Sequence, residues 1–378
     1  MGPLNGLKVI ELAGIGPGPM AAMLLADLGA TVLRIERKEP AGLGVPRPPR
    51  FDLLLRNRDS VPLDLKDPAA VALVLDMVVR TDVLIEGFRP GVCERLGLGP
   101  DVCLERNPRL VYGRITGWGQ DGPLAQAVGH DLNYIALAGA LHAIGRPGQA
   151  PAIPLNLIGD FGGGSLYLVM GILAALHESK SSGRGQVVDA AMVDGVASLM
   201  TQPQGTLAAG MMSHDRGTNI TDSGAPFYEV YECSDGRWVS IAAVEQKFYE
   251  QVLRVLELET LLPAQWVRSQ WPKAKRLIAE KIKTRSRDDW CRVFEGTDTC
   301  FAPVLTLDEA PQHPHLRERG TYVQVDGITQ PAPAPRFSRT PPATPTALRP
   351  WDPQSARATL APWLNDRQVD SAREAGLV

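Results

Sequence analysis

Residues 7–37 read LKVIELAGIGPGPMAAMLLADLGATVLRIER, and this stretch decides the fold. Residues 7–12 have the apolar character of a buried strand. Residues 20–28 have helical character with Pro19 near the first turn, and residues 30–37 form a second strand. A strand, a glycine-rich turn, a helix and another strand are typical of a unit with parallel strands. The sequence therefore predicts an α/β domain built on a parallel sheet.

The turn after the first strand argues against a dinucleotide site. It reads Gly14-Ile15-Gly16-Pro17-Gly18-Pro19, which is not the G-x-G-x-x-G pattern. Pro17 and Pro19 lack the backbone N–H groups that would hold a pyrophosphate at the start of the helix. We therefore do not expect an NAD-type cofactor.

Further elements extend the α/β pattern along the chain. Strands are expected over 82–86, 110–115 and 186–190, and helices over 131–144 and 161–177. Because the carboxyl ends of parallel strands meet at one edge of a sheet, the residues that follow them are expected to form the ligand site.

The composition changes along the chain and predicts two domains, since 378 residues are too many for one small core. A hairpin signal at 227–243 marks the second domain. The predicted boundaries are a large α/β domain over 1–200, a linker over 201–224, a small α+β domain over 225–325, and a proline-rich strap with a final helix over 326–378 that returns to the large domain.

Charge and cysteine content limit the class of protein. The net charge is −3 and there is no long basic run, so nucleic acid is not an expected partner. The five cysteines show no C-x-x-C spacing, which indicates a reducing compartment. No signal peptide and no apolar run of membrane-spanning length are apparent. We expect a cytoplasmic protein that does not bind a membrane.

His130 differs from the other five histidines. It lies in Gly129-His130-Asp131-Leu132-Asn133-Tyr134, at the start of a predicted helix. An imidazole there lies beside backbone N–H groups that the helix cannot satisfy, so the position can supply both a base and donors for an oxyanion. The alternative is that Asp131 only caps the helix. His313 and His315 lie in a proline-flanked loop and make a poor zinc site, so no metal is expected.

Asp160 is the second candidate for acid–base chemistry. It follows the apolar residues 154–159 and precedes Gly162-Gly163-Gly164. A carboxyl group buried among apolar residues has a raised pKa and can act as an acid near neutral pH. The glycines would let a ligand approach the backbone. The alternative is that Asp160 is a helix N-cap.

Several motifs together resemble the family III CoA-transferases of the CaiB/BaiF type. They lie at 12–19, 26–30, 34–37, 63–66 and 86–91. The stretches 129–134 and 159–164 resemble the α-methylacyl-CoA racemase branch of that family, and 224–228 and 231–236 continue the similarity in the small domain. The resemblance covers residues 4–340. It implies a Rossmann-like large domain, a smaller α+β domain and an interlocked homodimer.

The resemblance also implies roles for individual residues. His130 and Asp160 match the acid–base pair of the racemases, and Glu245 matches the glutamate partner of the histidine. The positions that border the CoA substrate are Ile15, Arg37, Leu63, Asp64, Leu65, Lys66, Arg89, Arg95, Asp131, Leu132, Asn133 and Tyr134. The segment 38–55 is longer than is usual in the family, so its contacts with the nucleotide stay open.

The resulting hypothesis is an isomerase of fatty acid metabolism that inverts C2 of 2-methylacyl-CoA thioesters through an enolate. One of His130 and Asp160 removes the α-proton and the other returns a proton to the opposite face, while Glu245 holds the imidazole. CoA is part of the substrate, and no cofactor is expected. The alternatives are a CoA-transferase with Asp160 as nucleophile and a catalytically silent CoA-binding protein.

Overall fold

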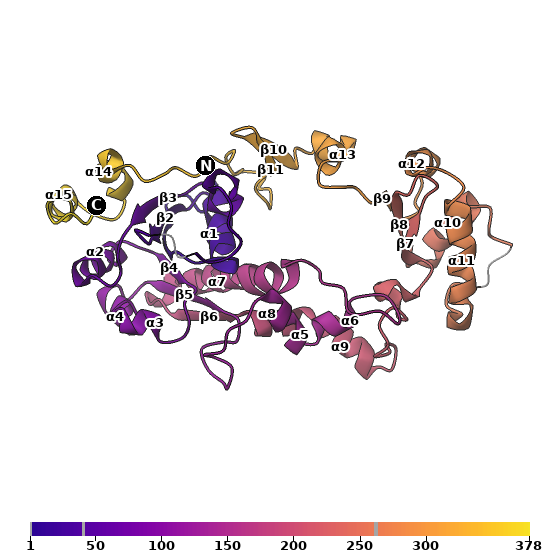
Figure 1. The fold of residues 1–378 in the computed structure, drawn as a ribbon, viewed down its shortest axis with the longest axis horizontal. Helices are drawn as coiled ribbons and strands as arrows, with labels where there is room; N and C mark the ends of the chain where they lie inside the picture. Colours follow the sequence, from indigo (N-terminus) through magenta and orange to yellow (C-terminus); the bar gives the residue numbers. More distant parts are fainter. Residues whose placement is uncertain (1, 40–41, 261–263) are drawn as a thin grey trace. The chain divides into compact units, whose positions relative to one another are not determined.

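The computed structural model describes residues 2–39, 42–260 and 264–378, which form two compact units. The larger unit contains residues 1–138, 155–199 and 320–378, and the smaller unit contains residues 139–154 and 200–319. The chain therefore leaves the larger unit twice and returns to it twice (Figure 1).

The larger unit is built on a sheet whose strands are all parallel, in the order β3-β2-β1-β4-β5-β6. Its strands are β1 (Lys8–Leu12), β2 (Thr31–Glu36), β3 (Asp59–Pro62), β4 (Val83–Glu86), β5 (Val111–Thr116) and β6 (Val187–Ala191). This is the strand order of doubly wound dinucleotide-binding folds, and it reverses direction between β1 and β4. The predicted Rossmann-like architecture is confirmed. Ligands of such sheets bind at the carboxyl edge beside this switch point.

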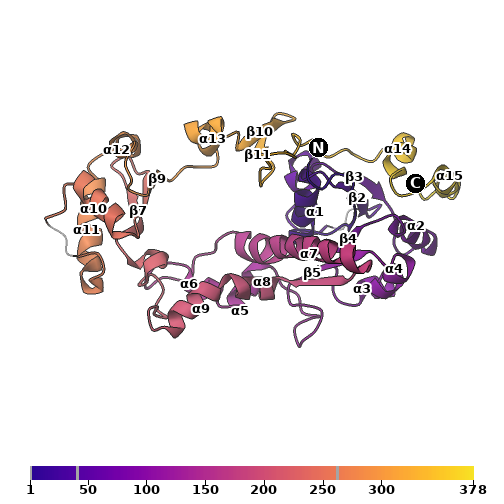
Figure 2. The same ribbon diagram turned by 180° about the vertical axis from the view of Figure 1, so that it is seen from behind.

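Helices cover both faces of the sheet (Figures 1 and 2). On one face, α1 (Pro17–Asp27) and α7 (Leu166–Ser182) pack on Val9, Val83 and Val111. On the other, α2 (Pro68–Val78) and α4 (Pro100–Arg106) pack on Leu33, Leu84 and Tyr112. Shorter elements of this unit are η1 (Pro49–Phe51), η2 (Leu53–Leu55), α3 (Val92–Arg95), α5 (Asp131–Leu137), η3 (Leu157–Ser165) and α8 (Met192–Leu199).

Buried ion pairs fix the amino-terminal half of this sheet. The Glu11 carboxylate, which is 1% exposed, pairs with both Arg34 and Arg58. At the end of α1, the Asp27 carboxylate accepts hydrogen bonds from Arg56 at 2.5 and 3.1 Å. Burying a charge is costly unless the charge is paired. These ion pairs therefore favour the local structure in which both partners lie together.

The carboxyl-terminal segment, residues 320–378, belongs to the larger unit. It contains β10 (Tyr322–Val325), β11 (Ile328–Pro331), η7 (Pro353–Ser355), α14 (Ala356–Leu360) and α15 (Asp366–Glu374). Arg56 donates to Gln330 and to the Pro331 carbonyl, and Lys8 donates to the Pro362 carbonyl. Trp363 is 1% exposed and packs in the core beneath α2. The strap is thus an integral part of the fold.

The smaller unit is an α+β body around the antiparallel sheet β7-β8-β9. Phe227, Trp271 and Trp290 fill its core. Its elements are α6 (Ala140–Ala143), α9 (Thr201–Ala208), η4 (Ile220–Gly224), β7 (Tyr228–Glu232), β8 (Trp238–Ala242), α10 (Gln246–Val255), η5 (Arg268–Gln270), α11 (Trp271–Ile282), α12 (Arg287–Phe294), β9 (Phe301–Pro303), η6 (Ala310–Gln312) and α13 (Pro314–Glu318).

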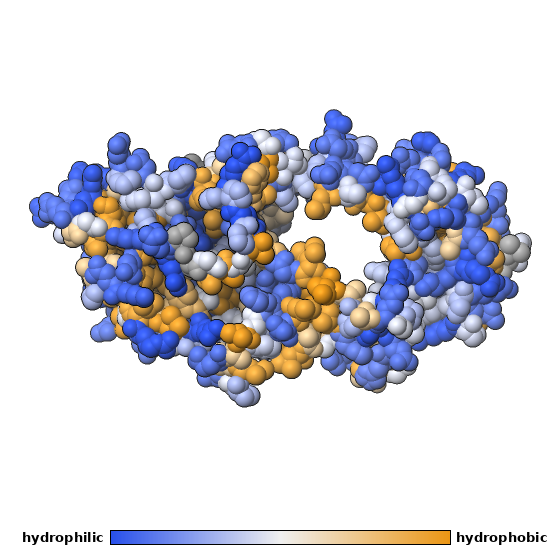
Figure 3. All heavy atoms as spheres, in the orientation of Figure 1, coloured by the Kyte–Doolittle hydropathy of each residue, from blue (hydrophilic) through white to orange (hydrophobic). Residues whose placement is uncertain are grey.

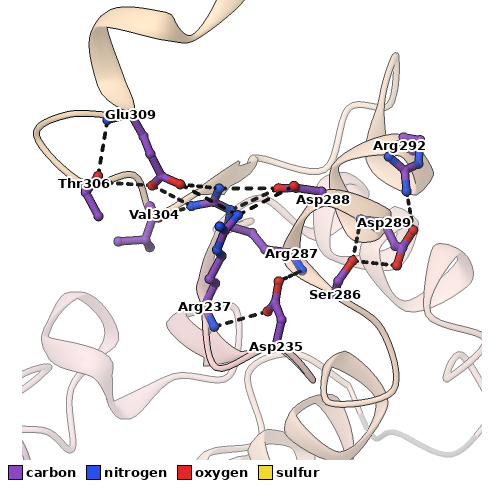
Figure 4. A network of polar contacts seen from close by, with 10 residues as sticks. All are labelled: Asp235, Arg237, Ser286, Arg287, Asp288, Asp289, Arg292, Val304, Thr306 and Glu309. Carbon is purple, nitrogen blue, oxygen red and sulfur yellow. Dashed lines mark hydrogen bonds and ion pairs between the residues drawn. The ribbon is translucent and has the colours of Figure 1, made fainter.

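An arginine network holds the edge of the smaller unit together (Figure 4). The Arg287 guanidinium donates to both oxygens of Glu309, at 2.9 and 2.8 Å, and to the Val304 carbonyl at 3.1 Å. The Arg287 N–H also donates to Asp235 in the turn between β7 and β8. The bidentate pair lowers the pKa of Glu309 to about 2. Arg287 therefore ties the start of α12 to the segment that follows β9.

The unit boundaries differ from the predicted ones in three places. Residues 139–154 belong to the smaller unit, because Arg146 donates to the buried Glu229 at 2.7 and 2.6 Å. The helix predicted over 131–144 accordingly ends at Leu137, and Gly139 follows in the left-handed conformation. Residues 201–224 include α9 and η4 and are not a linker, and residues 320–325 belong to the larger unit.

The helix η3–α7 is longer than the sequence suggested. It runs continuously over Leu157–Ser182, 26 residues, and by length and composition alone it could cross a membrane. A core helix passes the same test, and in this protein Leu168, Ile172 and Ala175 are buried against the sheet. The extra length comes from residues 157–160, in the π-helical turn, and from residues 178–182 at the other end of the helix.

Candidate active site

Asp160 lies inside the π-helical segment η3 and is not a helix N-cap. π-Helical turns within longer helices occur frequently at functional sites. The Asn156 amide donates to Asp160 Oδ2 at 3.1 Å. Burial raises the pKa of the Asp160 carboxyl, while the Asn156 hydrogen bond and the nearby His130 lower it in part. The side chain is therefore a carboxyl whose protonated form is favoured by its surroundings.

The turn after β1 brings the backbone close to Asp160. Gly16 has a φ of +66°, and a Cβ at this position would lie 3.2 Å from Asp160 Oδ2. Ser165 Oγ donates to the Pro17 carbonyl at 2.8 Å and to the Asp160 carbonyl at 3.0 Å. Because β1 borders the switch point of the sheet, these contacts place Asp160 where ligands of this fold class bind.

His130 occupies the N-cap position of α5, and its side chain is exposed. Its backbone N–H donates to Asn133 Oδ1 at 3.0 Å. The preceding loop is held by an aromatic pair, since the Tyr134 hydroxyl donates to the Gly129 carbonyl and the Tyr134 ring meets Trp118 edge-on at 4.8 Å. His130 lies close enough to Asp160 to act on its pKa. The two predicted bases therefore lie in the larger unit on segments that contact each other, since the Gly159 N–H donates to the Asp131 carboxylate.

The alternative interpretation, in which Asp131 only caps its own helix, is wrong. The Asp131 carboxylate is buried and accepts the Gly159 N–H at 3.1 and 2.9 Å. The first-turn N–H groups of Asp131 and Leu132 have no hydrogen-bond partner within the described residues. They remain available to an oxyanion, as the sequence predicted for this helix start.

Glu245 is placed in the smaller unit, whereas His130 and Asp160 are in the larger unit. It is the exposed N-cap residue of α10. Its charge contributes to the raised pKa of the Cys300 thiol, after burial as the first cause. Pairing between Glu245 and the histidine stays a prediction.

The predicted CoA positions that carry positive charge follow three of the parallel strands. Arg37 follows β2, Lys66 follows β3, and Arg89 follows β4, so all three lie at the carboxyl edge of the sheet. Their side chains and that of Arg95, in α3, are exposed and have no carboxylate partner within the described residues. Unpaired cations at a sheet edge are suited to bind phosphate groups.

The remaining CoA positions differ in character. Leu63 is buried at 1% exposure and so supports the edge from beneath, whereas Leu65 is partly exposed. Asp64 accepts the Lys66 N–H at 3.0 Å and shapes the turn after β3. Ile15 is 42% exposed, and a Cβ on Gly44 would lie 3.7 Å from it. Gly44, in the described part of the long segment 38–55, therefore lies beside the turn that carries Ile15, whereas residues 40–41 are outside the described residues.

Comparisons with known proteins agree with this arrangement. The sequence pattern described as CoA-transferase family III matches residues 4–356. Alpha-methylacyl-CoA racemase of Mus musculus is 44% identical over 360 residues, covering 94% of this chain and 91% of the relative. The Homo sapiens protein of the same name is 42% identical, and the match covers 89% of this chain and 87% of the human protein. The crystal structure of a CAIB/BAIF family protein from Brucella suis matches with a TM-score of 0.81 at 26% identity. The match covers 95% of this chain and 99% of the Brucella suis chain.

The chain belongs to CoA-transferase family III.

In this family member, one ion-pair network near the carboxyl edge of the sheet was not predicted from the sequence. Arg114 in β5 donates to Glu86 in β4 at 2.8 Å and to Glu94 at 2.8 Å. Glu86 also accepts the Phe88 N–H at 2.7 Å, which fixes the loop that leads to Arg89. The sequence did contain a signal for this ion pair, because Glu86 and Arg114 lie near the ends of two predicted strands. The two residues are direct partners in the sheet register.

Metal binding is not indicated within the described residues of this family member, because no group of three or more His, Cys, Asp or Glu side chains is placed to hold an ion. His313 begins α13 and His315 lies within it. The five cysteines are all free thiols.

Proposed function

We propose that the protein is an α-methylacyl-CoA racemase, which inverts C2 of 2-methylacyl-CoA thioesters by removing the α-proton from one face and delivering another proton to the opposite face. The observation that carries this proposal is the contact between the segments that bear His130 and Asp160, made by the hydrogen bond from the Gly159 N–H to the Asp131 carboxylate. Two relatives that are 42% and 44% identical over most of the chain bear that name.

The chemistry needs two groups of complementary protonation on opposite faces of C2. Burial raises the pKa of Asp160 from that of a free carboxyl, so its protonated form becomes a usable donor. A neutral imidazole at His130 then accepts the α-proton of one epimer, and the ionised Asp160 accepts that of the other. Each proton transfer leaves the partner group ready for the reverse reaction.

The intermediate carries its negative charge on the thioester oxygen. The N–H groups of Asp131 and Leu132 at the start of α5 are the donors we assign to that oxygen. Because they are fixed by the helix, they stabilise the enolate without reorganisation. All the catalytic groups then belong to the protein, and we propose that no cofactor is required, since CoA enters as part of the substrate.

We assign the CoA moiety to the carboxyl edge beyond β2, β3 and β4. Arg37, Lys66, Arg89 and Arg95 supply positive charge for its phosphates, and Ile15 and Leu65 supply apolar contacts. The net charge of −3 gives no general attraction for anions, so these local cations must provide it.

We propose that the active enzyme is an interlocked homodimer in which Glu245 of the second copy completes the site. The proposal is supported by exposed apolar side chains near the bases, on α5, η3, α7 and α8 (Figure 3): Leu132, Leu137, Leu157, Leu166, Met170 and Leu199. Exposed apolar side chains that gather in one region of the surface are typical of protein interfaces. Light scattering at micromolar concentration should give twice the chain mass of 40.8 kDa.

We further place the protein in the cytoplasm and in the metabolism of branched fatty acids. Five free cysteines support a reducing compartment. Cell fractionation with an antibody to the protein tests the first assignment, and the preference among branched, sterol-derived and arylpropionyl thioesters tests the second.

The function is tested with one epimer of a 2-methylacyl-CoA in D₂O. NMR should show deuterium entering C2 together with loss of stereochemical purity. A CoA-transferase that uses Asp160 as its nucleophile would instead move CoA to an added carboxylate without exchange at C2. A silent CoA-binding protein would bind the thioester and do neither.

A further inference from the structure

A buried carboxylate connects the two segments that carry the predicted bases. Asp131 is 5% exposed and follows His130 directly at the start of α5. Its two oxygens accept the N–H of Gly159 at 3.1 and 2.9 Å. Gly159 directly precedes Asp160. A single carboxylate thus joins the residue next to one base to the residue next to the other, across 28 positions of sequence.

The contact does not serve the helix in which Asp131 lies. The N-cap interaction of α5 is made by Asn133, whose side chain accepts the His130 N–H at 3.0 Å. Asp131 instead satisfies an N–H in the first turn of η3, where π-helical geometry leaves backbone donors without partners in their own helix. Burial raises the pKa of Asp131, the Gly159 hydrogen bond lowers it, and the charge of Asp160 raises it. A buried acid beside another acid is unfavourable for folding. The position of Asp131 beside Asp160 therefore argues for a functional role and not for a role in stability.

The fit also depends on the absence of a side chain at position 159. A Cβ on Gly159 would lie 2.6, 2.8 and 2.9 Å from the three carboxylate atoms of Asp131. These are its three nearest neighbours, so an alanine at 159 would conflict with Asp131 above all. The φ of Gly159 is not in the left-handed region, so an alanine would not strain the backbone.

We infer that Asp131 is a positioning residue that fixes the separation of His130 and Asp160 on either side of the substrate carbon. The inference rests on the proposed racemase function and deepens it. Proton transfer to opposite faces of one carbon requires both groups to be held at a defined spacing, and a misplacement of about 1 Å can cost on the order of 100-fold in rate. The same bond orders the first turn of α5, whose N–H groups we assign to the enolate oxygen.

Five variants separate positioning from plain stability. Asp131→Ala removes the bridge, and Gly159→Ala pushes on it from the other side. The double variant has room for the added methyl group, so its loss should not exceed that of the worse single variant, as expected for residues in direct contact. Asp27→Asn is the matched control, because Asp27 is equally buried but pairs with Arg56 and Asn57, away from the bases.

The readouts are kcat and KM for C2 inversion, the free energy of unfolding, and amide exchange of peptides over 157–165. Asp131→Ala and Gly159→Ala should each lower kcat by about 30- to 100-fold with KM changed less than about 3-fold, because the cations assigned to the CoA phosphates are unchanged. Asp131→Asn, which keeps one acceptor oxygen, should recover part of kcat. Asp27→Asn should lower stability and leave kcat and KM unchanged.

Additive losses in the double variant, or a kcat that falls only in proportion to the folded fraction, would overturn the inference. Failure of the proposed function itself gives a different result, since the wild-type protein would then show no inversion. In that case faster amide exchange at 157–165 in Asp131→Ala would still support the bridge between the two segments, and unchanged exchange would reject it.

Discussion

Replacing Gly163 by alanine should damage both the stability and the activity of the protein. Gly163 lies in η3, three positions after Asp160, and packs against the backbone of α8. A Cβ at 163 would lie 2.8 Å from the Val196 nitrogen and 3.0 Å from the Met192 oxygen. Since ordinary Cβ contacts begin at 3.4 Å, η3 and α8 must separate by about half an ångström.

The magnitudes follow from that displacement. Forcing an extra methyl group into a packed site costs about 1–3 kcal/mol, which for 378 residues lowers Tm by roughly 1–1.5 °C per kcal/mol. A misplacement of about 1 Å costs on the order of 100-fold in rate, so half of that should lower kcat about 10-fold. KM should change little, because the cations beyond β2, β3 and β4 are not displaced.

Gly205→Ala supplies the control for Gly163→Ala. Gly205 lies inside α9, and a Cβ there would meet no heavy atom within 4 Å. Alanine should therefore stabilise this helix by up to about 1 kcal/mol and leave kcat unchanged. Calorimetry and the C2 inversion assay measure both quantities on both variants. If Gly163→Ala matches Gly205→Ala in Tm and kcat, the close packing of η3 on α8 does not position Asp160.

Three further predictions concern charge. Asp27→Ala leaves the buried Arg56 guanidinium without its carboxylate and should cost about 3 kcal/mol in the free energy of unfolding, measured in urea. Asp160→Asn should abolish inversion yet stabilise the fold at pH 7.5. The raised pKa of Asp160 means that its stabilising contribution is present below its unfolded pKa and lost as pH rises through its folded pKa, so the gain should vanish at pH 4. Lys66→Ala and Arg89→Ala should each raise KM about 10-fold with kcat little changed, and should weaken its dependence on salt.

The sequence was informative where local chemistry decides the structure. The turn at 13–19 and its flanking apolar runs predicted β1, α1 and β2, and the hairpin signal predicted β7 and β8. The edge strand β3 was not predicted, because Asp59–Pro62 is short, polar and ends in proline. Those features suit an edge strand, which needs fewer apolar residues than a central one.

Long-range contacts were beyond the reach of local patterns. The excursion 139–154 belongs to the smaller unit through distant partners: Arg146 pairs with Glu229, 83 positions later, and Arg216 donates to the carbonyls of His142 and Gln149. In the same way, Asp131 looked like a helix cap, since nothing near it in sequence indicates that Gly159 is its partner. The candidate bases could be named from their motifs, whereas the contact that links their segments required the structure.

The most direct test of the two-base account compares both epimers of a 2-methylacyl-CoA with the His130→Ala and Asp160→Asn variants in D₂O. Neither variant should invert C2. If each residue serves one face, each variant should still exchange the α-proton of one epimer, and the two variants should differ in which epimer that is. Loss of exchange with the same epimer in both variants, or inversion at the wild-type rate in either, would contradict the assignment of His130 and Asp160 as the two bases.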